Sequence, residues 1–261
     1  DNRFNDDENS DEYRESEQRM RKMFALADHI VTSHEYLKST LSTYVPGRNI
    51  TCIEDALELE LSSDETSLSH VKAHLLFELY RARLQGAGWN KTRLIWFGTN
   101  GDNKEIRSGG MTDLVKLKTL LHSPAFRDKI TLTICSNGEK AYQDIFRDWK
   151  IPHFFIKWHP ATFYRVLRCN HVALVPLTIN SLTICKSNNR LLTALHNDLA
   201  VIADEIPSYK EFGQCIVLNE WENGLSAFVD NAQNRKDSVA EGKKIIGRKY
   251  LPQHIAFKWE T

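Results

Sequence analysis

The chain has 261 residues, of which 41% are hydrophobic, and lysine plus arginine equal aspartate plus glutamate at 34 each. Such a chain can bury a large core, and it has no overall charge field that would favour nucleic acid or an anionic membrane. No apolar run reaches the roughly 18 residues needed to cross a bilayer. Five widely spaced cysteines argue against a disulfide framework or a structural zinc site. We therefore expect a soluble, cytoplasmic protein without a metal or other cofactor.

The N-terminal region starts with a polar, acidic stretch and continues as one strand–helix–strand unit. Residues 1–12 have the composition of a disordered or exposed tail. Apolar residues at helical spacing predict a helix over 13–27, followed by a strand at 29–33, a helix at 35–41 and a strand at 49–54. Because the chain starts with aspartate and not methionine, we expect a fragment whose beginning is missing.

A predicted helix at 68–84 leads into a regular alternation of strands and helices. The strands are near-continuous apolar runs, as expected for parallel strands covered on both faces. They are predicted at 93–97, 129–135, 153–158, 171–176, 199–203 and 215–219, with helices near 111–122, 139–149, 161–169 and from 186, and closing helices near 235–250 and 252–259. This order predicts an α/β fold with a doubly wound, open parallel sheet. The expected parts are 1–60 (tail and partial N-terminal domain), 61–91 (linker helix), 92–234 (main domain) and 235–261 (C-terminal helices).

The predicted helix after strand 171–176 opens on Lys186-Ser187-Asn188-Asn189-Arg190. In an open α/β sheet, helix N-termini at the carboxyl ends of the strands direct free N–H groups into the ligand crevice. This helix start is suited to a phosphate, because the helix dipole and two cations would stabilise its charge. The alternative is that Ser187 or Asn188 only caps the helix and that both cations are solvated.

The loop after strand 93–97 reads Gly98-Thr99-Asn100-Gly101 and would lie at the same edge of the sheet. Glycines allow the backbone to approach a ligand closely, so the loop predicts a second wall of the crevice. The segment is neither a dinucleotide-binding fingerprint nor a P-loop, and by itself it is equally compatible with a simple turn.

Two other groups of residues carry chemistry that suits a site. His70 and His74 stand four apart on a predicted helix, a spacing that can bind zinc, but no third ligand accompanies them. Asp204 and Glu205 follow a predicted strand and suit either a role as a base or hydroxyl acceptor, or a solvated loop. The cations of helix 13–27 are balanced by acids, which argues against nucleic acid binding.

Six motifs occur in an order that resembles one enzyme family. They read RLIWFGTNG, GGMTDL, IKWHPATF, HVALVPL, KSNNRLLTAL and LAVIADEIPSYKEFG. This order is similar to the C-terminal, donor-binding domain of GT-B glycosyltransferases, related to the large retaining family 4 group. The stretch ALADHIVTSHEYLKSTL resembles the end of their N-terminal, acceptor-side domain. The resemblance covers nearly the whole chain.

The resemblance implies a Rossmann-like domain that binds a nucleotide sugar, in an enzyme that transfers the sugar to a glycan acceptor such as a bacterial surface polysaccharide. The diphosphate would lie against residues 98–101 and 186–190. The base would lie near Trp158 and His159, and Tyr209 would contact the donor. Trp158 and Tyr209 are equally compatible with positions in the core.

Two departures from the family pattern keep other functions open. Retaining GT-B enzymes often have Glu-x7-Glu, and the matching positions here are Cys185 and Thr193. The resemblance therefore assigns no catalytic residue, and Thr193 would hold a ribose hydroxyl without a negative charge. Only the end of the acceptor-side domain is present, so we expect this chain alone to bind a donor better than it turns one over, with any peripheral membrane contact made by the missing part. The alternatives are a non-catalytic GT-B-like binding or assembly module and a sugar-nucleotide epimerase.

Overall fold

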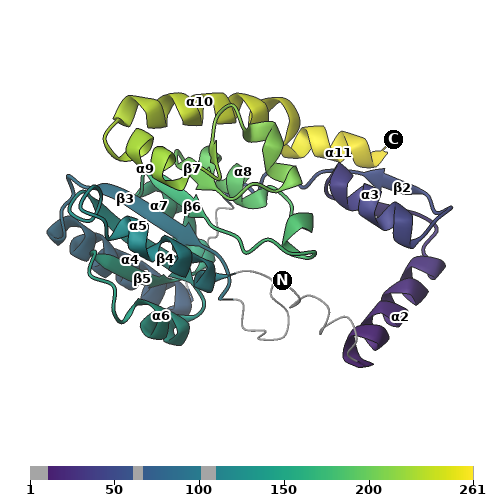
Figure 1. Ribbon diagram of the computed structural model, residues 1–261, viewed down its shortest axis with the longest axis horizontal. Coiled ribbons are helices and arrows are strands. Elements are labelled where there is room, and N and C mark those ends of the chain that lie inside the picture. The colour runs from purple at the N-terminus through teal and green to yellow at the C-terminus, as the bar shows by residue number, and fades with distance from the viewer. Residues whose placement is uncertain (1–10, 61–66, 101–109, 261) are drawn as a thin grey trace.

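The protein consists of an N-terminal unit and a larger α/β domain (Figure 1). The computed structural model describes residues 11–60, 67–100 and 110–260. In the N-terminal unit, α2 (Asp11–Leu26) precedes β1 (Ile30–Thr32), α3 (Glu35–Tyr44) and β2 (Ile50–Cys52), and the two strands pair in parallel. The predicted strand–helix–strand unit is confirmed, with both strands shorter than expected.

The α/β domain is built on a six-stranded parallel sheet with the order β5-β4-β3-β6-β7-β8. Its strands are β3 (Thr92–Phe97), β4 (Ile130–Ser136), β5 (His153–Lys157), β6 (Val172–Val175), β7 (Ala200–Ala203) and β8 (Val217–Leu218). The four central strands are buried along their whole length. The chain moves outward from β3 to β5 and then places β6 on the other side of β3, so the direction of winding reverses between β3 and β6. The predicted doubly wound sheet is confirmed.

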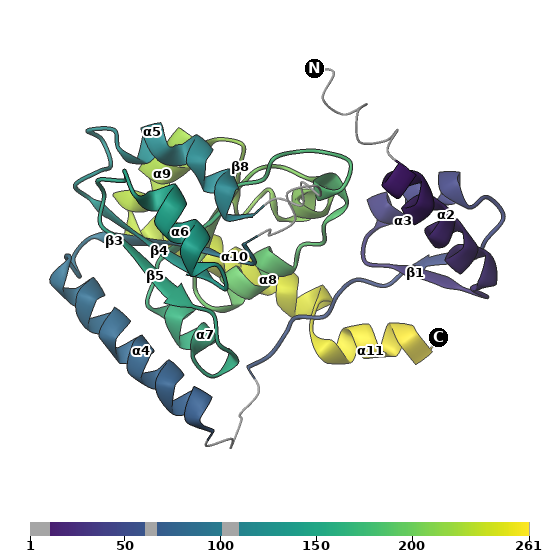
Figure 2. The same cartoon turned by 90° about the horizontal axis from the view of Figure 1, so that it is seen from below.

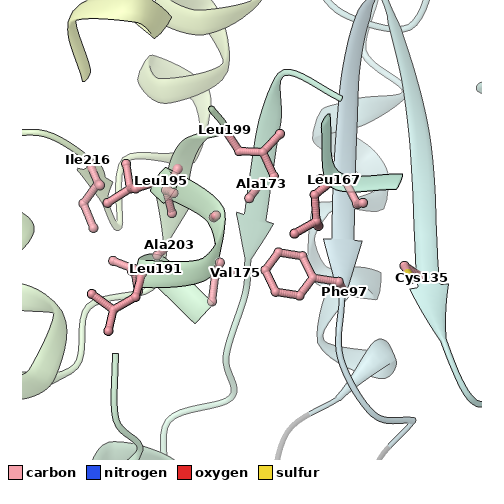
Figure 3. Packing of buried hydrophobic residues seen from close by; sticks show 14 of the residues in the cluster. Phe97, Cys135, Leu167, Ala173, Val175, Leu191, Leu195, Leu199, Ala203 and Ile216 are labelled. Carbon is pink, nitrogen blue, oxygen red and sulfur yellow. The ribbon is translucent and has the colours of Figure 1, made fainter. Parts of the chain in front are cut away.

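Helices cover both faces of the sheet and form a separate hydrophobic cluster with each face. On one face lie α4 (Leu68–Gly86), α7 (Pro160–Arg168), α8 (Asn189–His196) and α10 (Ala232–Lys249); on the other lie the 3-10 helix η2 (Met111–Leu117), α5 (Lys118–Leu121), α6 (Glu139–Phe146) and α9 (Trp221–Val229). Figure 3 shows the first cluster, with Phe97 of β3 close to Val175 of β6 and Leu191 of α8 beyond them.

The C-terminal helices return the chain to the N-terminal unit. α10 packs on α8, and α11 (Pro252–Glu260) lies beside the N-terminal unit (Figures 1 and 2). Glu54, just after β2, accepts a hydrogen bond from Lys258 of α11 at 2.5 Å and pairs with Lys249 at 3.2 Å. Burial alone would raise the pKa of Glu54, but these two ammonium groups hold it below its ordinary value. The ionised carboxylate thus ties β2 to the C-terminal helices.

Three local predictions differ from the structure. The helix predicted to open at Lys186 begins at Asn189, because residues before it form a 3-10 turn, η3 (Thr183–Cys185), that leaves Lys186 extended. The helix predicted near 111–122 is mostly the 3-10 helix η2. The sequence did not predict α9, whose pattern is interrupted by Gly224. That glycine is a packing requirement, since a β-carbon there would lie 3.0 Å from Val217 Cγ1.

Candidate functional site

The candidate site lies at the carboxyl ends of β3 and β6, where the winding of the sheet reverses. Gly98 follows β3 directly, and α8 follows β6 after a connection that includes η3. Because β3 and β6 are paired and parallel, the segments that follow them meet at one edge of the sheet. Residues 98–100 and 186–190 therefore lie on the same side of the molecule.

Gly98 and Arg190 are in direct contact at this edge. A β-carbon built on Gly98 would lie only 2.7 Å from Arg190 Nη2, so a larger residue at this position has to move the guanidinium. The guanidinium also lies over the ring of Trp96, 5.6 Å from its centroid, which helps to hold it in place. In the described part of the chain, no carboxylate pairs with Arg190. Its charge is therefore available to an anion in the adjoining cavity.

The rest of the glycine loop packs against the connection between β4 and α6. The Asn100 N–H donates to Asn137 Oδ1 at 2.9 Å, and a β-carbon on Gly138 would lie 2.5 Å from Asn100 Cγ. Thr99 is exposed. The predicted site residue Gly101 lies outside the described residues.

Lys186 lies in the extended segment just before α8. Its carbonyl accepts a hydrogen bond from Ser208 Oγ at 2.6 Å, which anchors the segment to the 3-10 helix η4 (Pro207–Phe212). Burial and the positive charge of Arg190 lower the pKa of Lys186, and Asp113 partly opposes them. Lys186 and Arg190 thus bring two positive charges to the start of α8.

The four residues at and before the start of α8, 187–190, differ in what their side chains contact. Asn189 and Arg190 line the cavity, and Ser187 is half-buried. Asn188 is 6% exposed, and its Nδ2 donates to Tyr250 Oη at 2.8 Å. We therefore correct the predicted ligand contact of Asn188: its side chain holds α8 to the end of α10. Because Asn188 does not cap α8 with its side chain, the first N–H groups of the helix remain available to a ligand.

A cavity of about 840 Å³ extends from Arg190 along the edge of the sheet. Aromatic rings form part of its walls, and Trp158, which is 47% exposed, lies 6.1 Å from the Phe163 ring between centroids. Thr193, one turn after Asn189, also lines it. The described lining residues are Glu58, Leu59, His70, Phe97, Trp158, Pro160, Phe163, Tyr164, Asn189, Arg190, Thr193 and Pro252. A cavity of this size is in the range of small-molecule sites.

His159 caps α7 at the edge of the cavity. The Ala161 N–H donates to His159 Nδ1 at 3.2 Å, and the His70 ring packs edge-on against His159 with centroids 5.0 Å apart. Burial, with His70 and His74 nearby, lowers the pKa of His159. This favours the neutral ring that the cap requires. His159 therefore shapes the turn beside Trp158, and its Nδ1 is already used by the protein.

The two histidines with zinc spacing have protein partners. His70 Nδ1 lies 2.7 Å from Ser67 Oγ, and His74 Nδ1 lies 2.9 Å from Arg165 Nη1. Within the described residues, no three histidine, cysteine or carboxylate side chains are grouped so that they could hold a metal ion.

Tyr209 and Asp204 have structural roles. Tyr209 is 1% exposed and belongs to the core, and burial raises its pKa to about 12. The predicted contact of its side chain with a donor is therefore wrong. Asp204 accepts hydrogen bonds from the Leu177 N–H at 2.6 Å, from Trp221 Nε1 at 3.1 Å and from Lys116. This carboxylate holds the loops after β6 and β7 and is neither a solvated group nor an accessible base.

No carboxylate occupies the two positions that match the Glu-x7-Glu pattern of retaining GT-B enzymes. Thr193 lines the cavity, although the residue is only 9% exposed. Cys185 is the last residue of η3. The Cys185 carbonyl accepts a hydrogen bond from His34 Nε2 at 2.9 Å, and His34 also caps α3. This contact fixes the N-terminal unit against the segment that precedes Lys186. The sequence signal for it, a histidine just before a helix, was too weak to detect.

A scan against protein-family models and a search of curated proteins both find no match. Solved structures do match the fold. WaaG, a glycosyltransferase involved in lipopolysaccharide biosynthesis, matches with a TM-score of 0.66 at 10% identity over 96% of this chain and 67% of WaaG. A TarM variant from S. aureus in complex with UDP matches with a TM-score of 0.64 at 11% identity over 94% of this chain and 45% of TarM.

Anabaena HepE in complex with UDP-glucose matches with a TM-score of 0.65 at 14% identity, over 94% of this chain and 68% of HepE. The chain thus spans between about half and two thirds of the length of these three proteins. At such low identity the likeness shows the fold alone. This chain has the fold of the GT-B glycosyltransferases.

Proposed function

We propose that this chain binds a uridine-diphosphate sugar and forms the donor-binding part of a glycosyltransferase that acts on a glycan acceptor. The observation that carries the proposal is the contact between Gly98 and Arg190, with Lys186 close by, at the point where the winding of the sheet reverses. A diphosphate there would receive charge-assisted hydrogen bonds from both cations and N–H groups from the start of α8.

The aromatic cavity next to Arg190 is suited to the nucleoside. Trp158 offers an exposed ring face on which a base can stack, and Thr193 offers a hydroxyl to the ribose. The bound ligands of TarM and HepE, UDP and UDP-glucose, support uridine as the base. We place the base near Trp158 and His159 and the diphosphate beside Arg190 and Lys186, at the start of α8.

The chemical contribution of this chain would be to stabilise the departing diphosphate. Arg190, Lys186 and the dipole of α8 are held in place before the reaction, so they can neutralise the charge that develops on the leaving group. We propose hexosyl transfer with retention, without a metal ion. Residues 92–234 would hold the donor, residues 1–60 would belong to the acceptor side, 61–91 would link them, and 235–261 would close the chain. All five cysteines are free, which supports a cytoplasmic setting.

Lys186→Ala is expected to weaken UDP binding about tenfold, because one hydrogen bond to a charged group contributes about 1.5 kcal/mol. Calorimetric titration with UDP, and with UDP-, GDP- and dTDP-sugars, measures the effect. Lys210→Ala is the matched control, since Lys210 pairs with Glu205 at 3.2 Å on the surface. The proposal fails if none of these nucleotides binds, or if Lys186→Ala binds UDP as tightly as the parent.

Gly98→Ala is expected to weaken UDP binding about tenfold by displacing the Arg190 guanidinium. The new β-carbon would stand 2.7 Å from Arg190 Nη2, and the φ of +156° at Gly98 is one that alanine rarely adopts. Gly247→Ala is the control, because no atom lies within 4 Å of a β-carbon there. In an Arg190→Ala background the Gly98 substitution should add little, since the group it displaces is gone. Full additivity would show that Gly98 acts independently of Arg190.

The alternative function is a non-catalytic GT-B-like module that binds a nucleotide sugar or assists assembly. The observation that favours it is the absence of a carboxylate at Cys185 and Thr193. Expression of the complete gene product with UDP-sugars and candidate glycan acceptors separates the two. Donor-dependent extension of a glycan eliminates the non-catalytic module, and tight UDP binding without turnover supports it.

A further inference from the structure

Helix α4 is apolar on two opposite faces. Its inner face is buried against the sheet and α7 through residues that repeat every three to four positions, namely His70, Ala73, Phe77, Tyr80 and Leu84. A helix at the surface of a domain normally has a polar outer face. The outer face of α4 is instead apolar. Packing within this domain therefore explains the apolar residues of the inner face but not those of the outer face.

Four residues form the outer apolar face, which we call the α4 stripe. Leu68 is 85% exposed, Val71 62%, Leu75 62% and Leu79 50%. Their spacing of three and four residues aligns them along one side of the helix, over about 17 Å at 1.5 Å per residue. Figure 2 shows α4 along the outer edge of the α/β domain. Contiguous apolar surface of this kind marks an interaction site.

One flank of the α4 stripe is basic, although the whole chain has no net charge. Helices α4 and α7 together carry one carboxylate, Glu78, and five cations, which are Lys72, Arg81, Arg83, Arg165 and Arg168. Arg81 and Arg165 pair with Glu78 at 2.7 and 3.0 Å, and Arg168 pairs with Glu60 at 2.7 Å. Within the described residues, Lys72 and Arg83 are the cations of this set that pair with no carboxylate. Helical geometry places Lys72 and Arg83 along one flank of the stripe. The surface that would cover the stripe should therefore be apolar within and anionic at its rim.

We infer that the α4 stripe docks the protein on an anionic lipid bilayer. The four side chains would enter the boundary between headgroups and acyl chains, while the cations bind lipid phosphates. Trp89, just after α4, is 46% exposed and stacks with the Arg93 guanidinium at 4.1 Å, an aromatic group suited to the membrane interface. The helix would lie on the bilayer. Within the described residues, no helix is long and apolar enough to span one.

Charge argues against a second copy of the chain as the occupant. In an antiparallel pairing about a two-fold axis at Leu75, the flank with Lys72 and Arg83 would face the same flank of the other copy. Like charges would then meet beside the apolar seam, which disfavours the pair. Docking through α4 is also distinct from a membrane contact made by the N-terminal region, and it does not depend on the proposed function.

Flotation with lipid vesicles tests the inference, with the protein free of nucleotide. The parent should partition onto vesicles of equal parts phosphatidylglycerol and phosphatidylcholine, and more weakly onto phosphatidylcholine alone. Leu75→Gln with Leu79→Gln should lower the partition coefficient at least tenfold, because two apolar side chains no longer enter the bilayer. Lys72→Gln with Arg83→Gln should lower it only on anionic vesicles, and added salt should do the same.

Met23→Gln on α2 is the matched control, since Met23 is 59% exposed on another helix, and it should partition as the parent does. All variants change exposed side chains, and their thermal midpoints should equal that of the parent. The inference is overturned if the parent does not bind anionic vesicles, or if the double leucine variant binds them equally. It is also overturned if light scattering shows a dimer that the leucine variant dissociates, because the occupant is then a second copy. UDP titration of the same variants shows separately whether the donor site is intact.

Discussion

Arg190→Ala is expected to weaken UDP binding by about 100-fold while leaving the protein folded. Arg190 can donate two hydrogen bonds to a diphosphate from one planar group, and each bond to a charged partner contributes about 1.5 kcal/mol. The guanidinium is held for this contact by the Trp96 ring at 5.6 Å, and in the described part of the chain no carboxylate competes for it. The loss should therefore exceed that of Lys186→Ala. Calorimetric titration with UDP measures both.

A second variant tests whether UDP binding needs the paired N–H donors of the Arg190 guanidinium or only its charge, and a third serves as a control. Arg190→Lys keeps the charge but not the paired donors, so it should recover only part of the lost affinity. Arg147→Ala removes a surface arginine that pairs with Asp144 at 3.3 Å, and it should bind UDP as the parent does. If Arg190→Ala binds UDP within twofold of the parent, the diphosphate does not lie at this position.

The sheet could be predicted from the sequence because its central strands are buried on both faces. Strands such as β6 and β7 are short apolar runs bounded by turns, and this pattern is visible without a partner. The convergence of Gly98 and Arg190 also followed from the sequence, through the rule that ligand sites form at the carboxyl ends of parallel strands. The order of the strands was not predicted, because it depends on pairing between distant segments.

The errors at the site arise where a local pattern has two structural meanings. From the sequence alone, a small polar residue at a helix start that contacts a ligand cannot be distinguished from one that points into the core. Asn188 faces the core because Tyr250, 62 residues later, supplies its partner. Tyr209 lies two residues after a proline, in the 3-10 helix η4, and its side chain is buried in the main hydrophobic cluster. The cavity wall combines His70, Phe163 and Pro252 from three helices, and no local pattern could bring these together.

A second large effect is expected from His171, just before β6. Arg93 is 7% exposed on β3, and its guanidinium donates to the Cys169 carbonyl at 2.5 Å and to the Trp89 carbonyl at 2.8 Å. Its remaining nitrogen, Nη2, lies 2.7 Å from His171 Nε2. The Arg93 backbone N–H also donates to His171 Nδ1 at 3.2 Å. Because an imidazolium has no acceptor nitrogen, the ring that accepts from Arg93 must be neutral. Burial, with the charges of Arg93 and Arg235, lowers the pKa of His171 to about 4.

This shift makes the stability of the α/β domain depend on pH. In the unfolded chain His171 binds a proton below about pH 6.5, whereas in the folded protein it does so only near pH 4. Between these values the unfolded state binds more protons. The contribution of the neutral ring is therefore complete above about pH 6.5 and is lost as the pH falls toward 4. The loss amounts to about 3 kcal/mol of unfolding free energy at pH 4.

Urea unfolding at pH 7 and pH 4 measures this loss, and His171→Gln separates it from the titration of carboxylates. Glutamine offers an amide oxygen to Arg93 but does not take up a proton, so the variant should lose about 3 kcal/mol less than the parent between the two pH values. His254→Gln changes an exposed histidine on α11 and should lose as much as the parent. Equal losses for the parent and His171→Gln would mean that His171 is protonated in the folded protein, and that Arg93 finds its acceptor elsewhere. Hydrogen exchange of the amides in β3 and β6 localises the effect, because their pairing includes the bond from the His171 N–H to the Arg93 carbonyl at 2.8 Å.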